Sequence, residues 1–235
     1  MAHESLKPED FYSTYENFRE YTSPKIGKTQ QRYFSKNYWE PCGFNTSMSV
    51  LEIGCGTGQF LKFFHQQGIT DLLGIDTDTK ILEFLPNELK SHVEIIDVNE
   101  FLLSLPEAER FDRIVMIDVF EHFSPSEGVS LLSRIKPLLK INGGVVVRVP
   151  NLASPWALTA QYGDLTHKAG YTSGSLRQLG LKAGYECLVT EYRRGNQRKQ
   201  KIENLFHSFV ELFITEPPDC WSASIVGFFQ PEPSE

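Results

Sequence analysis

The stretch that decides the fold is VLEIGCGTGQF, residues 50–60. Apolar residues come first, and Gly54, Gly56 and Gly58 follow before the next apolar segment begins. Glycine lets the backbone turn sharply and lets a ligand approach closely, because it has no Cβ. In an open α/β sheet, the turn after the first strand is where a nucleotide-like ligand binds. The stretch therefore predicts a buried strand, a ligand-binding turn and a helix.

Two common nucleotide-binding motifs differ from this turn. A dinucleotide fingerprint needs a glycine where this chain has Gln59. A phosphate-binding P-loop needs a Gly-Lys-Ser/Thr sequence, and none follows the turn. The spacing thus disfavours a nicotinamide or flavin dinucleotide and excludes a P-loop.

Apolar runs and helical patterns alternate on both sides of the glycines, which predicts a parallel sheet with helices on both faces. Ser124 and Pro125 are typical of a helix start, and Pro137 is expected to kink that helix near its end. The predicted strands are 49–53, 71–76, 92–97, 113–118, 143–150, 185–193 and 222–230. The predicted helices are 59–68, 79–85, 100–105, 124–140, 173–184 and 198–214.

The remaining segments complete the expected organisation. Residues 1–47 are polar and aromatic, and Phe11, Tyr15 and Phe18 lie on one face if the segment is helical. We expect an N-terminal helical flank or lid over 1–47 and one main domain over 48–235. Residues 151–172 are expected to form an ordered loop beside the active site.

Acidic residues follow the predicted strands at the edge where the glycine turn lies. Glu52 precedes the glycines, and Asp76, Asp97 and Asp118 end the next three strands. A carboxylate at the second strand can accept hydrogen bonds from ribose hydroxyls. Three such acids after a glycine turn predict a site for a ribose-containing ligand.

At these residues the sequence resembles the class I S-adenosylmethionine-dependent methyltransferases. The matching segments are VLEIGCGTG, LLGIDTD, VEIIDV, FDRIVMIDVFEHF and LLKINGGVVVRVP, over residues 49–150. The resemblance implies a doubly wound, Rossmann-like sheet of seven strands, with an antiparallel last strand and a helical insertion before it. It also implies S-adenosylmethionine as the cofactor. The residues expected to bind it are Glu52, Gly54, Cys55, Gly56, Gly58, Asp76, Thr77, Asp97, Val98, Asp118 and Val119.

Two histidines are candidates for removing a proton from the methyl acceptor. His122 follows the fourth strand, and its neutral imidazole accepts a proton near neutral pH. His167 lies three residues after Asp164, and an Asp beside a His fixes its tautomer and raises its basicity. Either histidine is expected to act as the base, with Asp164 orienting. No metal is expected, and the alternative is one Mg²⁺ bound by Asp118, Asp164 and His167.

The segments NLASPW and GDLTHKAGYTSGSLRQLGLKAGYE resemble bacterial sugar and polysaccharide O-methyltransferases. The resemblance implies a hydroxyl acceptor on a sugar or glycan. The alternatives are a small phenol, quinone-precursor or natural-product acceptor, and a cofactor-binding subunit without catalysis. The acceptor's identity and the oligomeric state stay open.

The net charge of −7 argues against a nucleic-acid partner. The four scattered cysteines favour a reducing, cytoplasmic setting, and we expect neither a signal peptide nor a membrane span.

One basic segment interrupts this acidic chain, with five basic residues within 193–201. It leads into a helix whose apolar residues repeat at helical spacing: Ile202, Leu205, Phe206, Phe209, Val210 and Phe213. We expect this helix to pack on the core. Peripheral contact of 193–214 with anionic lipid and a dimer contact are the alternatives.

Overall fold

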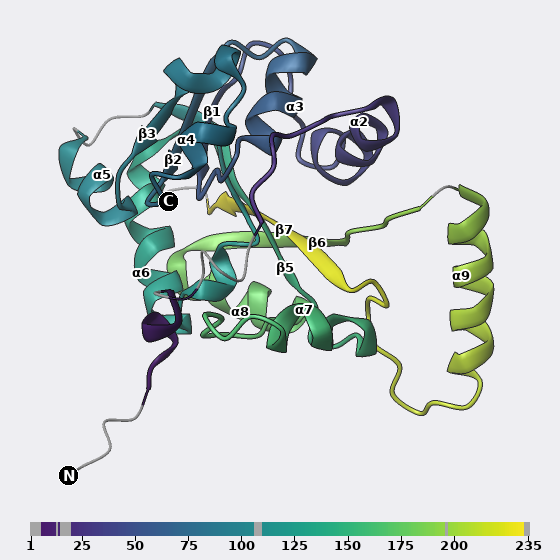
Figure 1. Cartoon of the computed structure of the whole chain (residues 1–235). Helices are drawn as coiled ribbons and strands as arrows, with labels where there is room; N and C mark the ends of the chain where they lie inside the picture. Colours follow the sequence, from purple (N-terminus) through teal and green to yellow (C-terminus); the bar gives the residue numbers. More distant parts are fainter. Residues whose placement is uncertain (1–5, 13, 15–19, 106–109, 196, 233–235) are drawn as a thin grey trace.

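The computed structural model describes residues 6–12, 14, 20–105, 110–195 and 197–232, and within them seven strands form one sheet between helices (Figure 1). The strand order is β3-β2-β1-β4-β5-β7-β6, with β7 antiparallel to both of its neighbours. The predicted seven-stranded fold with an antiparallel last strand is confirmed. The strands are β1 Ser49–Ile53, β2 Asp71–Asp76, β3 Val93–Ile95, β4 Phe111–Ile117, β5 Leu139–Pro150, β6 Tyr185–Glu191 and β7 Ser224–Pro231.

The helices follow the predicted alternation, with some shorter than expected. The α-helices are α2 Lys28–Phe34, α3 Gln59–Gln67, α4 Ile81–Phe84, α5 Val98–Ser104, α6 Pro125–Ile135, α7 Leu158–Tyr162, α8 Ser173–Ala183 and α9 Gln197–Glu211. Shorter helical turns are Pro8–Phe11, Ser35–Trp39, Asn87–His92, Phe120–His122, Lys136–Leu138 and Pro155–Ala157.

Local sequence explains where helices begin and end. Gly68, with φ of 99°, ends α3. Ser124 caps α6 by accepting from the Glu127 amide, and the Glu127 carboxylate accepts from the Ser124 amide. Pro137 does not kink α6, because the α-helix stops at Ile135 and a 3₁₀ turn follows. Proline has no N–H to continue the helical ladder.

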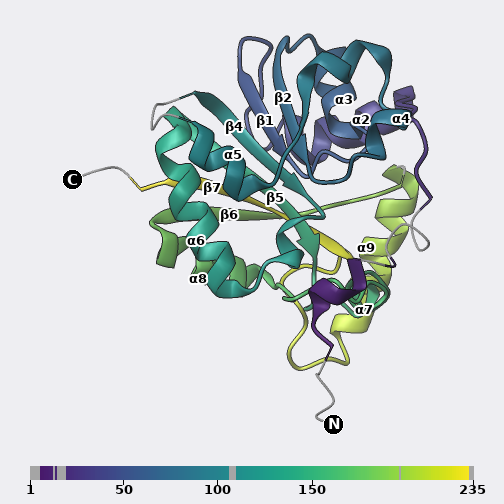
Figure 2. The same cartoon turned by 60° about the vertical axis from the view of Figure 1, so that its left-hand side comes forward.

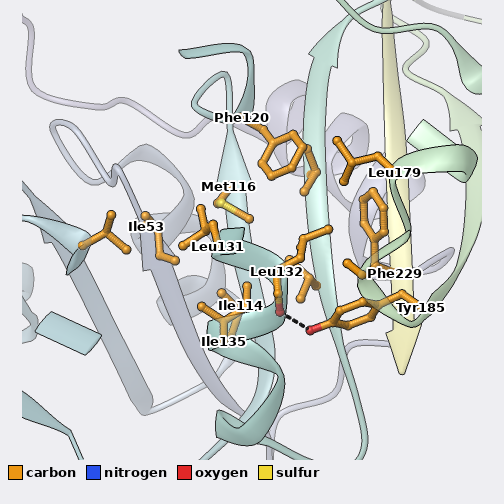
Figure 3. Close-up of a cluster of buried hydrophobic side chains, with 14 of the residues drawn as sticks. Ile53, Ile114, Met116, Phe120, Leu131, Leu132, Ile135, Leu179, Tyr185 and Phe229 are labelled. Carbon is orange, nitrogen blue, oxygen red and sulfur yellow. Dashed lines mark hydrogen bonds between the residues drawn. The ribbon is translucent and has the colours of Figure 1, made fainter. Parts of the chain in front are cut away.

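Helices α5, α6 and α8 cover one face of the sheet (Figure 2). The apolar side chains of α6 and α8 lie against those of β1 and β4 there (Figure 3). Tyr185 is fully buried there, and its hydroxyl donates to the Leu132 carbonyl at 2.8 Å. The buried phenol therefore has a partner for its polar atom.

The N-terminal flank belongs to the core on the opposite face. Phe34 of α2 stacks on Phe60 of α3 with ring centroids 4.4 Å apart, and Tyr38 meets Phe60 edge-on at 4.8 Å. The flank thus covers the helix that follows the glycine turn. Of the aromatic face expected near the start of the chain, Tyr15 and Phe18 lie outside the described residues.

Helix α9 does not pack its apolar face on the core, so that prediction is wrong. It stands beside the body of the protein (Figure 1), and Leu205 and Phe213 are 73% and 75% exposed. The face turned inward is polar: buried His207 stacks on Trp221 at 4.6 Å, and the Trp221 indole donates to Glu211 at 2.7 Å. The apolar residues of α9 do repeat at helical spacing, but the polar side of the helix contacts the rest of the protein.

Among the described residues, no helix combines the length and the apolar character that crossing a membrane requires.

Candidate functional site

The glycine turn joins β1 to α3, and all three of its glycines have positive φ: 71° at Gly54, 52° at Gly56 and 81° at Gly58. A Cβ at Gly54 would come within 2.5 Å of Val119, whereas one at Gly56 would point into open space. The Gly56 amide donates to the Asp76 carboxylate at 2.8 Å. The turn is therefore closely packed at Gly54 and leaves space for a ligand at Gly56.

A cavity of about 750 Å³ lies over this turn, at the carboxyl ends of the parallel strands. The expected cofactor residues that line it are Glu52, Gly54, Cys55, Gly56, Asp76, Thr77, Asp97, Val98, Asp118 and Val119. Gly58 is not part of the wall, because it begins α3 and faces Leu85 and Leu89. Ten of the eleven residues expected from the sequence thus meet around one space.

Asp76 shapes the turn as well as the cavity wall. Its second oxygen accepts from the Asp78 amide at 3.0 Å, next to the bond from Gly56. Burial raises the pKa of this carboxyl, and the backbone hydrogen bonds only partly offset that effect. A carboxylate here has acceptor positions left for ligand hydroxyls, because it can accept about four hydrogen bonds.

Glu52 and Asp97 each make a structural contact beside the cavity. Glu52 is 3% exposed and accepts from the Leu61 amide at 3.2 Å, and burial raises its pKa well above the ordinary value. Asp97 caps α5 by accepting from the Asn99 amide at 2.8 Å. Both carboxyls therefore tie a strand end to the following helix.

Asp118 is held in an unusual backbone conformation. Its φ is 54°, a left-handed value that is uncommon outside glycine and recurs at functional sites. The guanidinium of Arg148 on β5 binds both carboxylate oxygens of Asp118, one of them at 2.7 Å. Arg148 also donates to the buried Tyr38 hydroxyl at 3.1 Å. The pair fixes one wall of the cavity and connects it to the N-terminal flank.

The start of the chain supplies two tyrosines to the cavity wall. The Tyr21 hydroxyl donates to Asp78 at 2.6 Å. The Tyr12 hydroxyl lies 3.1 Å from Nδ1 of His122. Nearby, Lys168 reaches the cavity and pairs with Glu9 at 2.5 Å. These contacts place polar groups at the mouth of the cavity.

The candidate catalytic residues form one cluster beside that mouth. His122 lines the cavity, and its Nδ1 is 3.0 Å from the Thr166 hydroxyl, which donates to Asp164 at 2.5 Å. Burial acts to raise the pKa of Asp164, but the hydrogen bonds from the hydroxyl and amide of Thr166, together with His167 and His122, lower that pKa overall. His167 lies behind His122, with ring centroids 4.7 Å apart, and is not in the cavity wall. Asp164 therefore contacts His122 through Thr166. Its other oxygen lies 3.9 Å from Nε2 of His167, the histidine with which the sequence associated it.

Comparison with known proteins gives this arrangement a family. The methyltransferase domain family matches residues 18–190, which contain the glycine turn, Asp76, Asp118 and the histidine cluster. The chain belongs to the methyltransferase domain family. Residues 18–190 therefore form a methyltransferase domain.

Curated relatives match less than half of this chain. An uncharacterized methyltransferase of Alkaliphilus oremlandii is 34% identical over 98 residues, covering 42% of this chain and 44% of the relative. A ubiquinone biosynthesis O-methyltransferase of Rhodopseudomonas palustris is 32% identical over 105 residues, covering 44% of this chain and 40% of that protein. The matches span less than half of each relative's length.

Solved structures share the fold over most of the methyltransferase. A SAM-dependent methyltransferase from Archaeoglobus fulgidus superimposes with a TM-score of 0.67 at 22% identity, covering 85% of this chain and 91% of that one. The plantazolicin methyltransferase, solved with S-adenosylhomocysteine, gives a TM-score of 0.57 at 18% identity, covering 95% and 90%.

The residues present fit S-adenosylmethionine. Gly56 leaves open space where a side chain would fill the cavity, and Asp76 faces that space with acceptor capacity for ribose hydroxyls. The cavity wall also contains residues that the sequence did not predict: Tyr12, Tyr21, Arg148 and Lys168. Arg148 carried a usable signal, because it is the lone charge within the apolar run VVVRVP.

Proposed function

We propose that this methyltransferase methylates a hydroxyl group, and that the acceptor is a sugar or glycan. The observation that carries the proposal is His122, an imidazole at the mouth of the cofactor cavity that is oriented through Thr166 and Asp164. An aliphatic hydroxyl ionises weakly and needs a positioned base, whereas an amine does not. A buried Asp that orients a histidine serves that purpose.

The chain's own residues align the acceptor and take its proton. S-adenosylmethionine supplies a methyl group on a positively charged sulfur, which keeps the electron pair of the broken carbon–sulfur bond. The acceptor oxygen bonds to the methyl carbon, and its proton passes to Nε2 of His122. Thr166 accepts the hydrogen on Nδ1, so the other ring nitrogen is the proton acceptor.

The polar character of the mouth favours a polyhydroxylated acceptor. Lys168, with its partners Glu9 and Glu127, lies beside His122 and offers charged groups for hydroxyls. The alternative acceptor is a phenol or quinone precursor, and Tyr12 and Phe123 at the mouth offer aromatic surface for it. The curated ubiquinone biosynthesis relative supports that alternative.

An acceptor panel tests the proposal. S-adenosylhomocysteine release is measured with nucleotide sugars, glycans, phenols, amines and peptides. We expect turnover with a sugar hydroxyl, and we expect His122→Ala to lose about 10²–10⁴-fold in turnover. Cofactor affinity should stay within a few-fold, because His122 is not at the glycine turn. Turnover of amines alone, or full activity of His122→Ala, would overturn the proposal.

We also propose that α9 brings the enzyme to an anionic lipid surface, where a lipid-linked acceptor would be presented. The exposed apolar row contains Ile202, Leu205, Phe206, Phe209 and Phe213. Arg198 and Lys199 precede Ile202 by four and three residues, so they lie on the same helix face. A chain of net charge −7 thus presents positive charge and apolar surface together.

Vesicle flotation tests the lipid proposal, using phosphatidylcholine alone or mixed equally with phosphatidylserine. Binding is expected only with phosphatidylserine. Each basic residue near the surface contributes about 1 kcal/mol, so Arg198→Ala with Lys199→Ala should weaken binding about 30-fold. Leu103→Ser is the matched control, because Leu103 is 81% exposed on α5. A concentration-dependent dimer without lipid binding would assign the face to a second copy instead.

A further inference from the structure

Three side chains of the types that bind metal ions meet just behind the mouth of the cavity. His122, Asp164 and His167 each bring one nitrogen or oxygen within 4.8 Å of the others. Glu121 lies beside them: its side chain is 1% exposed, and its Oε1 lies 4.0 Å from Nε2 of His167. Asp164 Oδ2 lies 3.9 Å from the same nitrogen. Two imidazoles and the Asp164 carboxylate therefore face one small volume, and the Glu121 carboxylate lies next to His167.

Both imidazoles are oriented by a contact at Nδ1. His167 Nδ1 is 2.9 Å from the Gln161 carbonyl, which can only accept, so this nitrogen carries the hydrogen. The Thr166 hydroxyl gives its one hydrogen to Asp164, so it must accept the hydrogen from His122 Nδ1. In both neutral rings Nε2 is then the nitrogen with the lone pair. Metal-binding histidines are typically oriented in this way.

Asp164 gives an independent indication that something is bound there. It is 8% exposed, and its Oδ2 accepts no hydrogen bond from any described residue. Buried carboxylate oxygens normally have a partner, because leaving one without is costly. This oxygen is directed toward His167 Nε2. Both atoms carry lone pairs that repel each other, and a cation bound between them would remove that repulsion.

The distances fit a metal ion better than a hydrogen bond. Hydrogen bonds between nitrogen and oxygen are about 2.7–3.2 Å long, whereas the carboxylate oxygens lie 3.9 and 4.0 Å from His167 Nε2. Ligands at about 2.0–2.2 Å from one ion are at most about 4.4 Å apart. Both separations fall inside that limit.

We infer that this methyltransferase binds one divalent transition-metal ion through His122, His167 and Asp164. Mixed imidazole and carboxylate ligands suit Mn²⁺, Fe²⁺ or Zn²⁺. Asp118, which the sequence associated with a metal, is not a ligand, because Arg148 binds both of its oxygens.

The ion would lie next to the acceptor position, since His122 lines the cavity. A hydroxyl bound to such an ion loses its proton more easily, and that proton would pass to solvent. With the ion bound, His122 would hold the ion, and the metal-free enzyme alone would use His122 as the proton acceptor described above. This catalytic role rests on the proposed function, but binding of the ion does not.

Titration of metal-stripped protein with Mn²⁺ tests the inference, followed by calorimetry and by the electron paramagnetic resonance signal of Mn²⁺. We expect one ion per chain. Asp164→Asn and His167→Asn should each weaken binding more than 100-fold. Thr166→Val, which removes only the orienting hydroxyl, should weaken it about 10- to 100-fold. His65→Ala is the matched control, because His65 is exposed and lies outside the cluster.

S-adenosylmethionine titration of each variant shows whether the cofactor cavity is intact, so a loss of metal binding cannot be mistaken for unfolding. Mn²⁺ affinity that is absent, or equal in the wild type and Asp164→Asn, would overturn the inference. The acceptor panel separates it from the proposed function. Metal binding at the cluster without turnover of any hydroxyl overturns only the function, and hydroxyl turnover without metal binding overturns only the inference.

Discussion

Replacing Asp76 by asparagine should separate the cofactor-binding role of this residue from its size. The two side chains have the same shape, but the amide has one acceptor oxygen in place of two. In the native protein, one carboxylate oxygen accepts from Gly56 at 2.8 Å and the other from Asp78 at 3.0 Å. In Asp76→Asn, an NH₂ group must face one of these two N–H groups, and the charge that would bind the ribose hydroxyls is lost.

The size of the effect follows from the bonds removed. A hydrogen bond to a charged group contributes about 1.5–3 kcal/mol, so losing one from the cofactor complex raises the dissociation constant about 10- to 150-fold. Calorimetric titration with S-adenosylmethionine and with S-adenosylhomocysteine measures this change. Asp71→Asn is the control, because Asp71 is exposed at the other end of β2. Affinity within threefold of the wild type would refute the assignment of Asp76 to the ribose.

Three further changes test other parts of the structure. Glu52→Gln should keep the acceptor for the Leu61 amide while removing a buried acid. Because burial raises the folded pKa of Glu52 above its unfolded value, its contribution to stability is full at low pH and is lost as pH rises above about 4.5. The melting temperature of ligand-free Glu52→Gln should therefore exceed that of the wild type at pH 8 and equal it near pH 4, and parallel pH profiles would contradict this. Gly54→Ala should lower the free energy of unfolding in urea by about 1–3 kcal/mol, since φ is 71° and a Cβ would meet Val119 at 2.5 Å; a smaller loss than in Gly56→Ala would count against the argument. Tyr185→Phe should cost about 1 kcal/mol in the same assay, because it removes the donor to the Leu132 carbonyl, and unchanged stability would contradict that role.

The cofactor half of the site was predictable because its signals are local. A strand, a glycine turn and a helix form one continuous segment, and acids that follow parallel strands meet at one sheet edge. That rule brought Asp76, Asp97 and Asp118 to the same cavity without any knowledge of side-chain contacts.

The rest of the site depends on contacts between distant segments. Tyr12 meets His122 across 110 positions of the chain, and Arg148 meets Tyr38 across the same separation. Neither pairing leaves a pattern in the sequence near either residue. The packing of α9 could not be predicted for a related reason. Periodicity identifies an apolar face of a helix, but only the tertiary structure decides which face meets the core.

The place of β7 in the sheet has a consequence during protein synthesis. Although β7 follows the other six described strands along the chain, it lies between β5 and β6, and β6 pairs with no other strand of the described residues. A ribosome-bound chain that has not yet released residues 224–231 therefore carries one open strand edge on β5 and an unpaired β6. Such edges promote association with other chains. Nascent chains stalled just before residue 224 should thus depend on chaperones far more than chains stalled within a long C-terminal linker appended after β7.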